Sequence, residues 1–180
     1  RTVGTKTDGI SMDEGAGSGL RERKPRHGTP AAIALLGTGE SRDAYHMSTP
    51  HPEGLGARMA MVQALASADL PPEAVDYINL HGTGTRSNDA TEDKAARSVL
   101  GRDTSRSSTK GWTGHTLGAC GAIDAILRAL AIRQSLRPGS ANTPPPAATP
   151  GPHPRLATRR PPPRHAPCPC RPPGRHPPSR

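Results

Sequence analysis

The stretch over residues 107–128 constrains the fold more than any other part of the chain. A β-prone run ends at Lys110, a glycine-rich turn presents His115, and a helix pattern follows. The helix carries apolar residues at i, i+3, i+4 and i+7 on one face, namely Ile123, Ile126, Leu127 and Leu130. A strand, a glycine turn and a helix in this order place polar side chains at the rim of an α/β sheet. We therefore expect Lys110 and His115 to face one pocket, because the glycines between them let the backbone turn tightly.

Residues 30 to 140 alternate between strand and helix patterns, and residues 1–23 add further strand material broken by glycines. The expected strands and helices cover, in chain order, residues 31–36, 56–68, 75–80, about 88–100, 105–110 and the region after the second turn to about 136. Asn88 or Asp89 is the expected cap of the second helix. This alternation predicts an α/β fold with a mainly parallel sheet and helices on its faces.

The residues from Pro144 onward differ from the rest in composition. They hold 15 of the 22 prolines and seven arginines, with no lysine, aspartate or glutamate. Of the formal net charge of +9, the tail thus supplies +7, so the basic balance says little about partners of the folded part. We expect a folded domain over 1–143 and a disordered or polyproline-like tail over 144–180. We hypothesise that a reading-frame shift in a GC-rich gene produced this tail; the competing interpretation is a tail that binds RNA or an acidic partner.

The cysteines and the hydropathy pattern indicate the cellular compartment in which the protein is expected. Three cysteines make no disulfide framework, and Cys168-Pro-Cys170 has no matching second pair for zinc, so a reducing cytoplasm is expected. Cys120 is expected to be a small buried apolar residue. The sequence has no run of 18 apolar residues and no signal-peptide pattern, so no membrane association is predicted. Because the chain starts with Arg-Thr-Val rather than Met, we expect it to be part of a longer protein.

Two of the eight histidines stand out. His81 and His115 each follow a predicted strand and lie inside a turn of glycine and threonine. Strand ends at one rim of an α/β sheet are where active sites form, so both histidines are candidates for catalysis. The remaining histidines lie in polar loops or in the tail and receive no role.

Several motifs together resemble the β-ketoacyl-acyl-carrier-protein synthases, the condensing enzymes of fatty acid and polyketide assembly. They are His81-Gly-Thr-Gly-Thr85, Lys110-Gly-Trp-Thr-Gly-His115-Thr-Leu-Gly-Ala-Cys-Gly-Ala, Val75-Asp-Tyr-Ile-Asn-Leu-His81 and Asp43-Ala-Tyr-His-Met-Ser-Thr-Pro. The resemblance covers about residues 5–143, and two histidines are typical of the elongating synthases. It implies the C-terminal half of a thiolase-like fold, with α-β-α-β-α layers and a mixed, largely parallel sheet. It also implies a homodimer, acyl carrier protein as partner, malonyl and acyl thioesters as substrates, and no metal or separate cofactor.

The resemblance assigns roles to particular residues. His81 and His115 are the implied catalytic pair, and Lys110 holds positive charge beside them. Thr83 and Thr85 match threonines that bind the phosphopantetheine arm.

Asp124 departs from the family pattern, which has glutamate at that position. Aspartate is one methylene shorter, so we expect a loose or water-bridged link to Lys110. An i,i+4 bond to Arg128 is the alternative partner for Asp124.

The family's nucleophilic cysteine lies far upstream of the His81 motif, and nothing in this sequence corresponds to it. Cys120 follows the second histidine at a position where the family usually has alanine, so it is not expected to act as nucleophile. We therefore predict that this chain alone does not catalyse condensation. Two other hypotheses remain: a non-catalytic partner subunit that lacks the cysteine, or a basic interaction protein that acts through its tail, although nucleic acid is not the expected partner.

Overall fold

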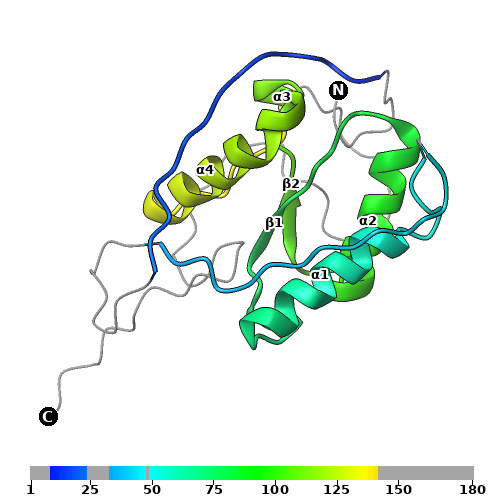
Figure 1. The fold of residues 1–180 in the computed structure, drawn as a ribbon, viewed down its shortest axis with the longest axis horizontal. Coiled ribbons are helices and arrows are strands. Elements are labelled where there is room, and N and C mark those ends of the chain that lie inside the picture. Colours follow the sequence, from blue (N-terminus) through cyan, green and yellow to red (C-terminus); the bar gives the residue numbers. More distant parts are fainter. Residues whose placement is uncertain (1–8, 24–32, 48, 142–180) are drawn as a thin grey trace, which may run out of the picture.

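The computed structural model describes residues 9–23, 33–47 and 49–141. Its elements are, in chain order, α1 (Leu55–Ala68), the 3-10 turn η1 (Pro72–Ala74), β1 (Tyr77–Asn79), α2 (Arg86–Leu100), β2 (Ser105–Ser107), α3 (Lys110–Thr113), the 3-10 turn η2 (Leu117–Ala119) and α4 (Cys120–Arg133). Figure 1 shows the two strands between α4 on one side and α1 with α2 on the other. The expected alternation of strands and helices is therefore present from α1 onward. The predicted tail over 144–180 lies outside the described residues.

The two strands form a small parallel sheet whose core is largely polar. Tyr77 pairs with Ser105, and Asn79 pairs with Ser107. The hydroxyls of Tyr77 and Ser107 lie 2.6 Å apart, and Ser107 Oγ donates to the carbonyl of Pro138 at 2.6 Å. Because a serine hydroxyl has one proton, Tyr77 is the donor in the first bond. These bonds satisfy buried polar groups whose desolvation would otherwise be costly.

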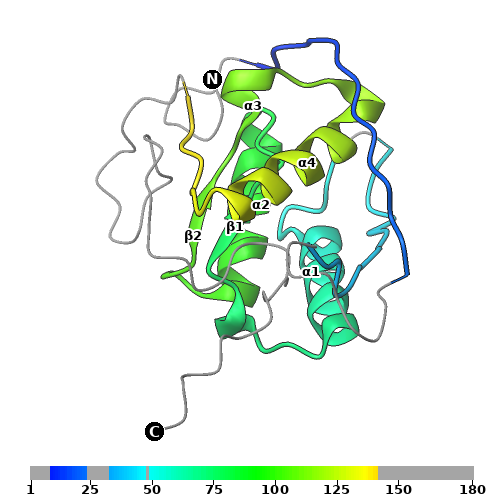
Figure 2. The same cartoon turned by 90° about the vertical axis from the view of Figure 1, so that its left-hand side faces the viewer.

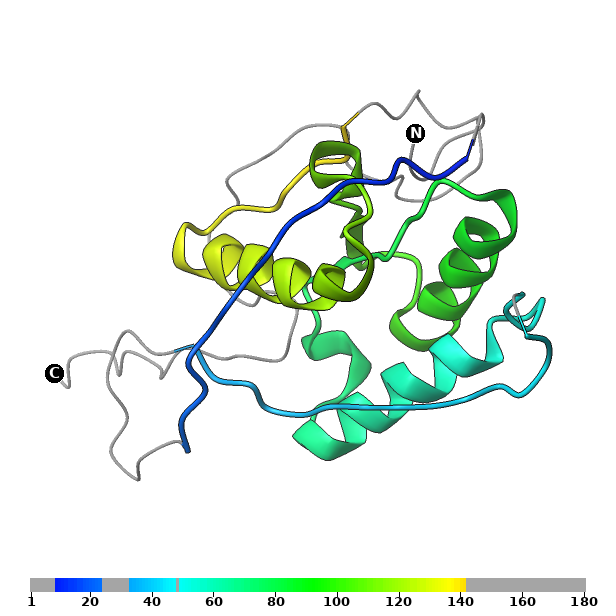
Figure 3. The same cartoon turned by 45° about the horizontal axis from the view of Figure 1, so that its top comes forward.

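The expected strand over 31–36 is wrong for the residues that can be checked, because no strand forms over 33–36. Figure 3 shows this segment running along α1. A Cβ on Gly37 would lie 2.6 Å from the carbonyl oxygen of Ala64, and one on Gly39 would overlap the carbonyl oxygen of Ala60. The segment therefore lies with its glycine backbone directly on the helix, a contact that a run of apolar residues does not reveal.

Residues 9–23 are also largely outside strands, and they cover one side of α4 (Figure 2). A Cβ on Gly15 would meet the Cδ1 atom of Ile123 at 3.0 Å, and one on Gly17 would meet that of Ile126 at 2.9 Å. The predicted apolar stripe of α4 thus packs in part against the N-terminal segment. The buried residues of α4 are Cys120, Asp124 and Ala131. The side of α4 that carries Cys120 and Asp124 consequently offers polar groups to the sheet.

Helix boundaries differ by a few residues from the sequence prediction. α2 begins at Arg86 with Thr85 in the N-cap position, so neither Asn88 nor Asp89 is the cap. Asp89 instead accepts the backbone N–H of Gly84 at 3.3 Å from inside the first turn of the helix. α4 ends at Arg133 rather than near Leu136. In the part of the chain that the structure describes, no helix is long and apolar enough to span a membrane.

The close approach of the extended segment to α1 predicts a sharp difference between two glycines. Gly39→Ala forces a methyl group against the backbone of α1, and we expect it to destabilise the protein by about 1–3 kcal/mol. Gly121→Ala in α4 is the control, because an added Cβ there meets no atom within 4 Å. It should leave stability equal or raise it by about 0.5–1 kcal/mol through helix propensity. Urea unfolding followed by circular dichroism measures both; equal stability of Gly39→Ala and the parent chain would contradict the packing described.

Candidate active site at the two histidine turns

The first histidine turn connects β1 to α2. Gly82 and Gly84 have φ values of 47° and 82°, a backbone conformation that glycine adopts without a steric penalty. The carboxylate of Glu92, one and a half turns into α2, accepts the backbone N–H of His81 at 2.6 Å and of Gly82 at 2.9 Å. Burial is the largest influence on this carboxyl and raises the pKa of Glu92, while the two N–H groups oppose that rise. Glu92 therefore fixes the backbone that carries His81.

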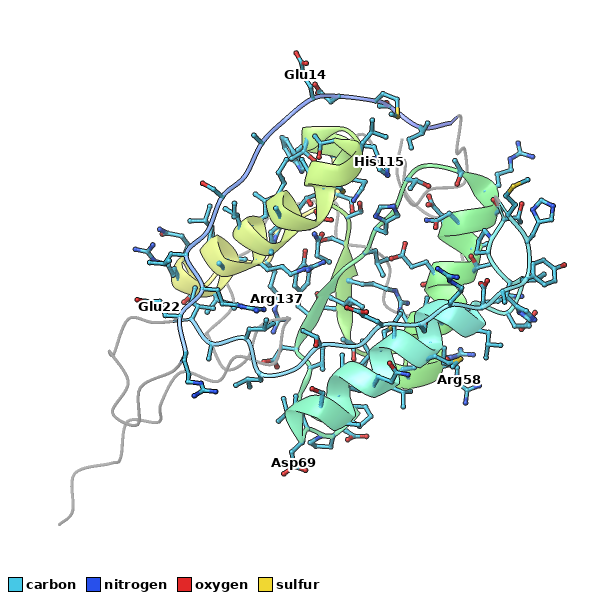
Figure 4. The ribbon with its side chains drawn as sticks, in the orientation of Figure 1. Glu14, Glu22, Arg58, Asp69, His115 and Arg137 are labelled. Atoms are coloured by element: carbon cyan, nitrogen blue, oxygen red, sulfur yellow. The ribbon has the colours of Figure 1, made fainter. Side chains whose placement is uncertain are left out.

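The second histidine turn follows β2 and differs from its predicted form. The strand ends at Ser107, and Lys110 is the first residue of the short helix α3 instead of the last residue of the strand. Gly114 has φ 65°, and a Cβ there would lie 2.5 Å from Cβ of Asp13. His115 then leads into η2 and α4, and Figure 4 shows it at the end of α4 nearest α3.

The N-terminal segment contacts both histidine turns. The N–H of Gly9 donates to the carbonyl of Gly84 at 3.2 Å. The N–H of His115 donates to Ser11 at 2.8 Å, and the N–H of Asp13 donates back to His115 at 3.2 Å. Backbone bonds of this kind do not depend on the side chains of the segment, so nothing in its sequence pattern revealed this role.

The structure brings His81 and His115 together, as expected from their places after neighbouring parallel strands. Their ring centroids are 5.0 Å apart and the ring planes are nearly perpendicular, at 84°. Nδ1 of His115 accepts the backbone N–H of Leu117 at 3.0 Å. An acceptor nitrogen carries no proton, so neutral His115 is protonated on Nε2, which is free to act as a donor.

His81 is held toward its neutral form. Burial lowers its pKa from the ordinary 6.5, and the positive charge of Lys110 and the neighbouring His115 lower the pKa further. A neutral imidazole in this place offers one N–H donor and one acceptor without a fixed charge.

Lys110 and Asp124 form a buried ion pair beside the histidines. The Nζ–Oδ2 distance is 3.1 Å, and the side chains are 2% and 7% exposed. The expectation of a loose or water-bridged link is therefore wrong. The shorter carboxylate is within direct reach because Lys110 starts a helix instead of ending a strand. Arg128, the alternative partner of Asp124, donates to the carbonyl of Asn79 at 3.3 Å.

Asn79 is a site residue that sequence reasoning missed. Its Nδ2 donates to Asp124 Oδ1 at 3.2 Å, and its Oδ1 accepts the N–H of Thr109 at 3.2 Å. Thr109 Oγ1 also donates to Asp124 Oδ1, at 3.3 Å. The signal available in the sequence was an asparagine within the predicted strand over 75–80. Asn79 joins β1 to the second turn and to α4 through these bonds.

The remaining predicted residues lie around this centre. The hydroxyls of Thr83 and Thr85 are 2.9 Å apart, and Thr83 is buried. Cys120 is buried as predicted, and its Sγ lies 3.6 Å from Asp124 Oδ2. Donor atoms of His81, Cys120 and Asp124 all lie within 4.8 Å of one another. Trp112 is 67% exposed, and its indole N–H donates to the carbonyl of Gly139 at 3.2 Å.

Comparison with known proteins places these residues in a family context. Residues 32–144 match the model of the β-ketoacyl synthase C-terminal domain. The 3-oxoacyl-[acyl-carrier-protein] synthase 2 of Coxiella burnetii is 41% identical over 142 residues, which cover 75% of this chain and 34% of the relative. The mitochondrial 3-oxoacyl-[acyl-carrier-protein] synthase of Arabidopsis thaliana is 39% identical and is covered over 31% of its length. The chain thus spans about a third of the length of these curated relatives.

Two solved structures that resemble this chain are also ketosynthases. A ketosynthase from Xenorhabdus doucetiae, in complex with its chain length factor, is 46% identical with a TM-score of 0.64; the match covers 73% of this chain and 33% of that one. A type II polyketide ketosynthase, solved in complex with its acyl-carrier protein, is 32% identical with a TM-score of 0.60, over 63% of this chain and 29% of that one. The predicted α/β, thiolase-like fold class is therefore confirmed.

The buried ion pair predicts a large effect of removing one charge. Asp124→Asn keeps the size of the side chain but leaves the buried ammonium of Lys110 without its counter-charge, and we expect a loss of about 3–5 kcal/mol of unfolding free energy. The exposed pair between Lys94 and Glu53 is the control, with side chains 55% and 71% exposed. Glu53→Gln should change stability far less, because solvent screens an exposed pair. Denaturant unfolding of both variants decides the matter: similar small losses would show that the Lys110–Asp124 pair is not a structural centre.

The lowered pKa of His81 predicts a pH dependence with a definite sign. The unfolded chain binds a proton on this histidine at higher pH than the folded protein, so the unfolding free energy falls as pH drops through the unfolded value near 6.5. Titration of the ring protons by NMR should give a pKa for His81 below 6.5, and Lys110→Met should raise it. A pKa of His81 at or above 6.5 would contradict the electrostatics described.

Proposed function

The chain belongs to the β-ketoacyl synthase family, and we propose that its paired histidines decarboxylate the malonyl group of a carrier-bound thioester. The observation that carries this proposal is the edge-to-face contact of His81 and His115 at 5.0 Å. Two imidazoles at this distance can direct N–H groups toward one small acceptor. The reaction class is the decarboxylative Claisen condensation of fatty acid or polyketide synthesis, catalysed by a 3-oxoacyl-acyl-carrier-protein synthase.

The chemistry follows from where negative charge develops. When the malonyl thioester loses CO₂, the electron pair of the breaking C–C bond passes into an enolate whose charge rests on the thioester oxygen. Donors that are already aimed at that oxygen lower the barrier, because they need no reorganisation during the reaction. Nε2–H of His115 is such a donor, since its Nδ1 is occupied by the backbone of Leu117. The lowered pKa of His81 keeps the second ring neutral beside it.

Lys110 acts on this pair through its charge. Its ammonium lowers the pKa of His81, and Asp124 holds the ammonium in place at 3.1 Å. We assign Lys110 to the catalytic group and Asp124 to its support. Thr83 and Thr85 are assigned to the phosphopantetheine arm, whose amides suit two hydroxyls on one turn. No further cofactor is required by this scheme.

The partners in this proposal are acyl carrier protein and the malonyl and acyl thioesters. Support comes from a related ketosynthase that was solved in complex with its acyl-carrier protein. A homodimer stays a prediction from family resemblance. We further propose that the 180-residue chain alone does not hold an acyl group, because its cysteines at 120, 168 and 170 do not correspond to the family nucleophile.

A second candidate is a partner subunit that lacks the nucleophile. The related ketosynthase from Xenorhabdus doucetiae was solved with a chain length factor, so paired subunits exist among the relatives. Both histidines and Lys110 are retained here, which favours the decarboxylating role. The alternative of a basic tail that binds acidic partners falls on residues outside the described part.

Incubation of the purified chain with malonyl-acyl carrier protein tests the proposal. We expect loss of CO₂ and formation of acetyl-acyl carrier protein, seen by intact-protein mass spectrometry. His81→Ala should slow this reaction about 100-fold, because one donor to the enolate oxygen is lost. His51→Ala is the matched control outside the site and should leave the rate unchanged.

The same experiment with acyl carrier protein that carries a saturated acyl chain tests the proposal that the 180-residue chain does not hold an acyl group. No acyl group should transfer to the 180-residue chain. An unchanged decarboxylation rate in His81→Ala would contradict the assigned chemistry, and a stable thioester on Cys120 would contradict the absence of a nucleophile.

A further inference from the structure

We propose that His81, Cys120 and Asp124 form a binding site for a zinc ion. Their nitrogen, sulfur and oxygen donor atoms all lie within 4.8 Å of one another. Two of the three donors are deeply buried, since Cys120 is 6% exposed and Asp124 is 5% exposed. This site is separate from the decarboxylation chemistry proposed above. The family resemblance implied no metal. Cys120 is what makes it possible, because the resembling synthases usually have alanine at that position.

The two donors from α4 are already spaced for a tetrahedral metal. Cys120 and Asp124 are four residues apart, so they lie on the same face of the helix one turn from each other. Their Sγ and Oδ2 atoms are 3.6 Å apart. Zinc bonds of about 2.3 Å to sulfur and about 2.1 Å to oxygen, at a tetrahedral angle, require an S–O separation of roughly 3.6 Å. The helix therefore presents two ligands without rearrangement.

His81 supplies the third donor from the opposite side. Its backbone is held by Glu92, but its side chain stands on a turn next to Gly82 and is more exposed than the two α4 donors. A tetrahedral site needs the imidazole nitrogen at roughly 3.5 Å from the other donors. The upper limit of 4.8 Å means that a movement of about 1 Å completes the three-ligand set.

Asp124 can accept a metal while it keeps its structural bonds. Its Oδ1 accepts from Asn79 at 3.2 Å and from Thr109 at 3.3 Å, and these bonds orient the carboxylate as supporting groups do around metal ligands. Its Oδ2 accepts from Lys110 at 3.1 Å and from the thiol of Cys120 at 3.6 Å. Zinc takes the place of the thiol proton, which leaves to solvent. The thiolate so formed supplies the negative charge that offsets the ion, while the ammonium of Lys110 keeps its bond to Oδ2.

The donor set selects the class of metal. A thiolate, an imidazole and a carboxylate together suit zinc, whereas magnesium and calcium take oxygen ligands. Three protein ligands leave the fourth tetrahedral position to water. A bound ion ties the ring of His81 to α4, which removes that ring from the pair with His115.

Cobalt(II) is the spectroscopic probe for this site, because it takes the same tetrahedral geometry and a bound thiolate gives an intense near-ultraviolet charge-transfer band. The test uses the full 180-residue chain with Cys168→Ser and Cys170→Ser, so that Cys120 is the remaining thiol. We expect the thiolate band and the strong visible bands of tetrahedral cobalt, and we expect zinc to abolish both in competition. Adding Cys120→Ala should remove the charge-transfer band and weaken zinc binding at least about tenfold.

The controls separate loss of a ligand from loss of folding. His81→Ala should weaken zinc binding to a similar extent, while His51→Ala should have no effect. Far-ultraviolet circular dichroism must be the same in all variants; if Cys120→Ala unfolds, Cys120→Ser replaces it with a side chain of similar size. Absence of the thiolate band in a folded parent chain, or its persistence after loss of Cys120, would overturn the proposal. Neither result depends on decarboxylation, so failure of the zinc site is distinguishable from failure of the proposed function.

Discussion

The buried ion pair between Lys110 and Asp124 is the interaction on which the rest of the site depends. It joins the start of α3 to the second turn of α4 at 3.1 Å, and neither side chain is more than 7% exposed. A buried pair is weak evidence for stability in itself, since desolvation offsets much of the attraction. Its value lies in specificity: Asn79 and Thr109 donate to the other carboxylate oxygen of Asp124, so β1, the start of α3 and α4 must keep one relative arrangement to satisfy this buried carboxylate.

The relative position of the two histidine turns is fixed by the Lys110–Asp124 pair and by two sets of hydrogen bonds to the backbone of the turns. Glu92 accepts two N–H groups of the first turn, and residues 9–13 bond to the backbone of both turns. The rings of His81 and His115 therefore meet although 34 residues separate them in the sequence. Burial and the nearby ammonium of Lys110 lower the pKa of His81, which favours the neutral imidazole that can donate to a forming enolate.

Sequence reasoning found the parts of the fold that depend on local pattern. Periodicity located α1 and α4, and glycine-threonine turns after strand patterns located His81 and His115. The sequence prediction failed where contacts between segments far apart in the sequence determine the local structure. Residues 33–36 look like a strand but lie on α1 through Gly37 and Gly39, because contact with a helix leaves no alternating signal. Glu92 was missed since its partners are backbone N–H groups, and the direct bond of Asp124 to Lys110 was missed because β2 ends at Ser107 rather than at Lys110.

The contact between the rings of His81 and His115 makes one site of the two histidine turns. The nuclear Overhauser effect between their imidazole ring protons measures this most directly, with each ring assigned by comparison with His81→Ala and His115→Ala. Ring centroids 5.0 Å apart in an edge-to-face arrangement predict a clear cross-peak between the two rings. A folded protein with both rings assigned and no such cross-peak would show that the two rings do not form one site.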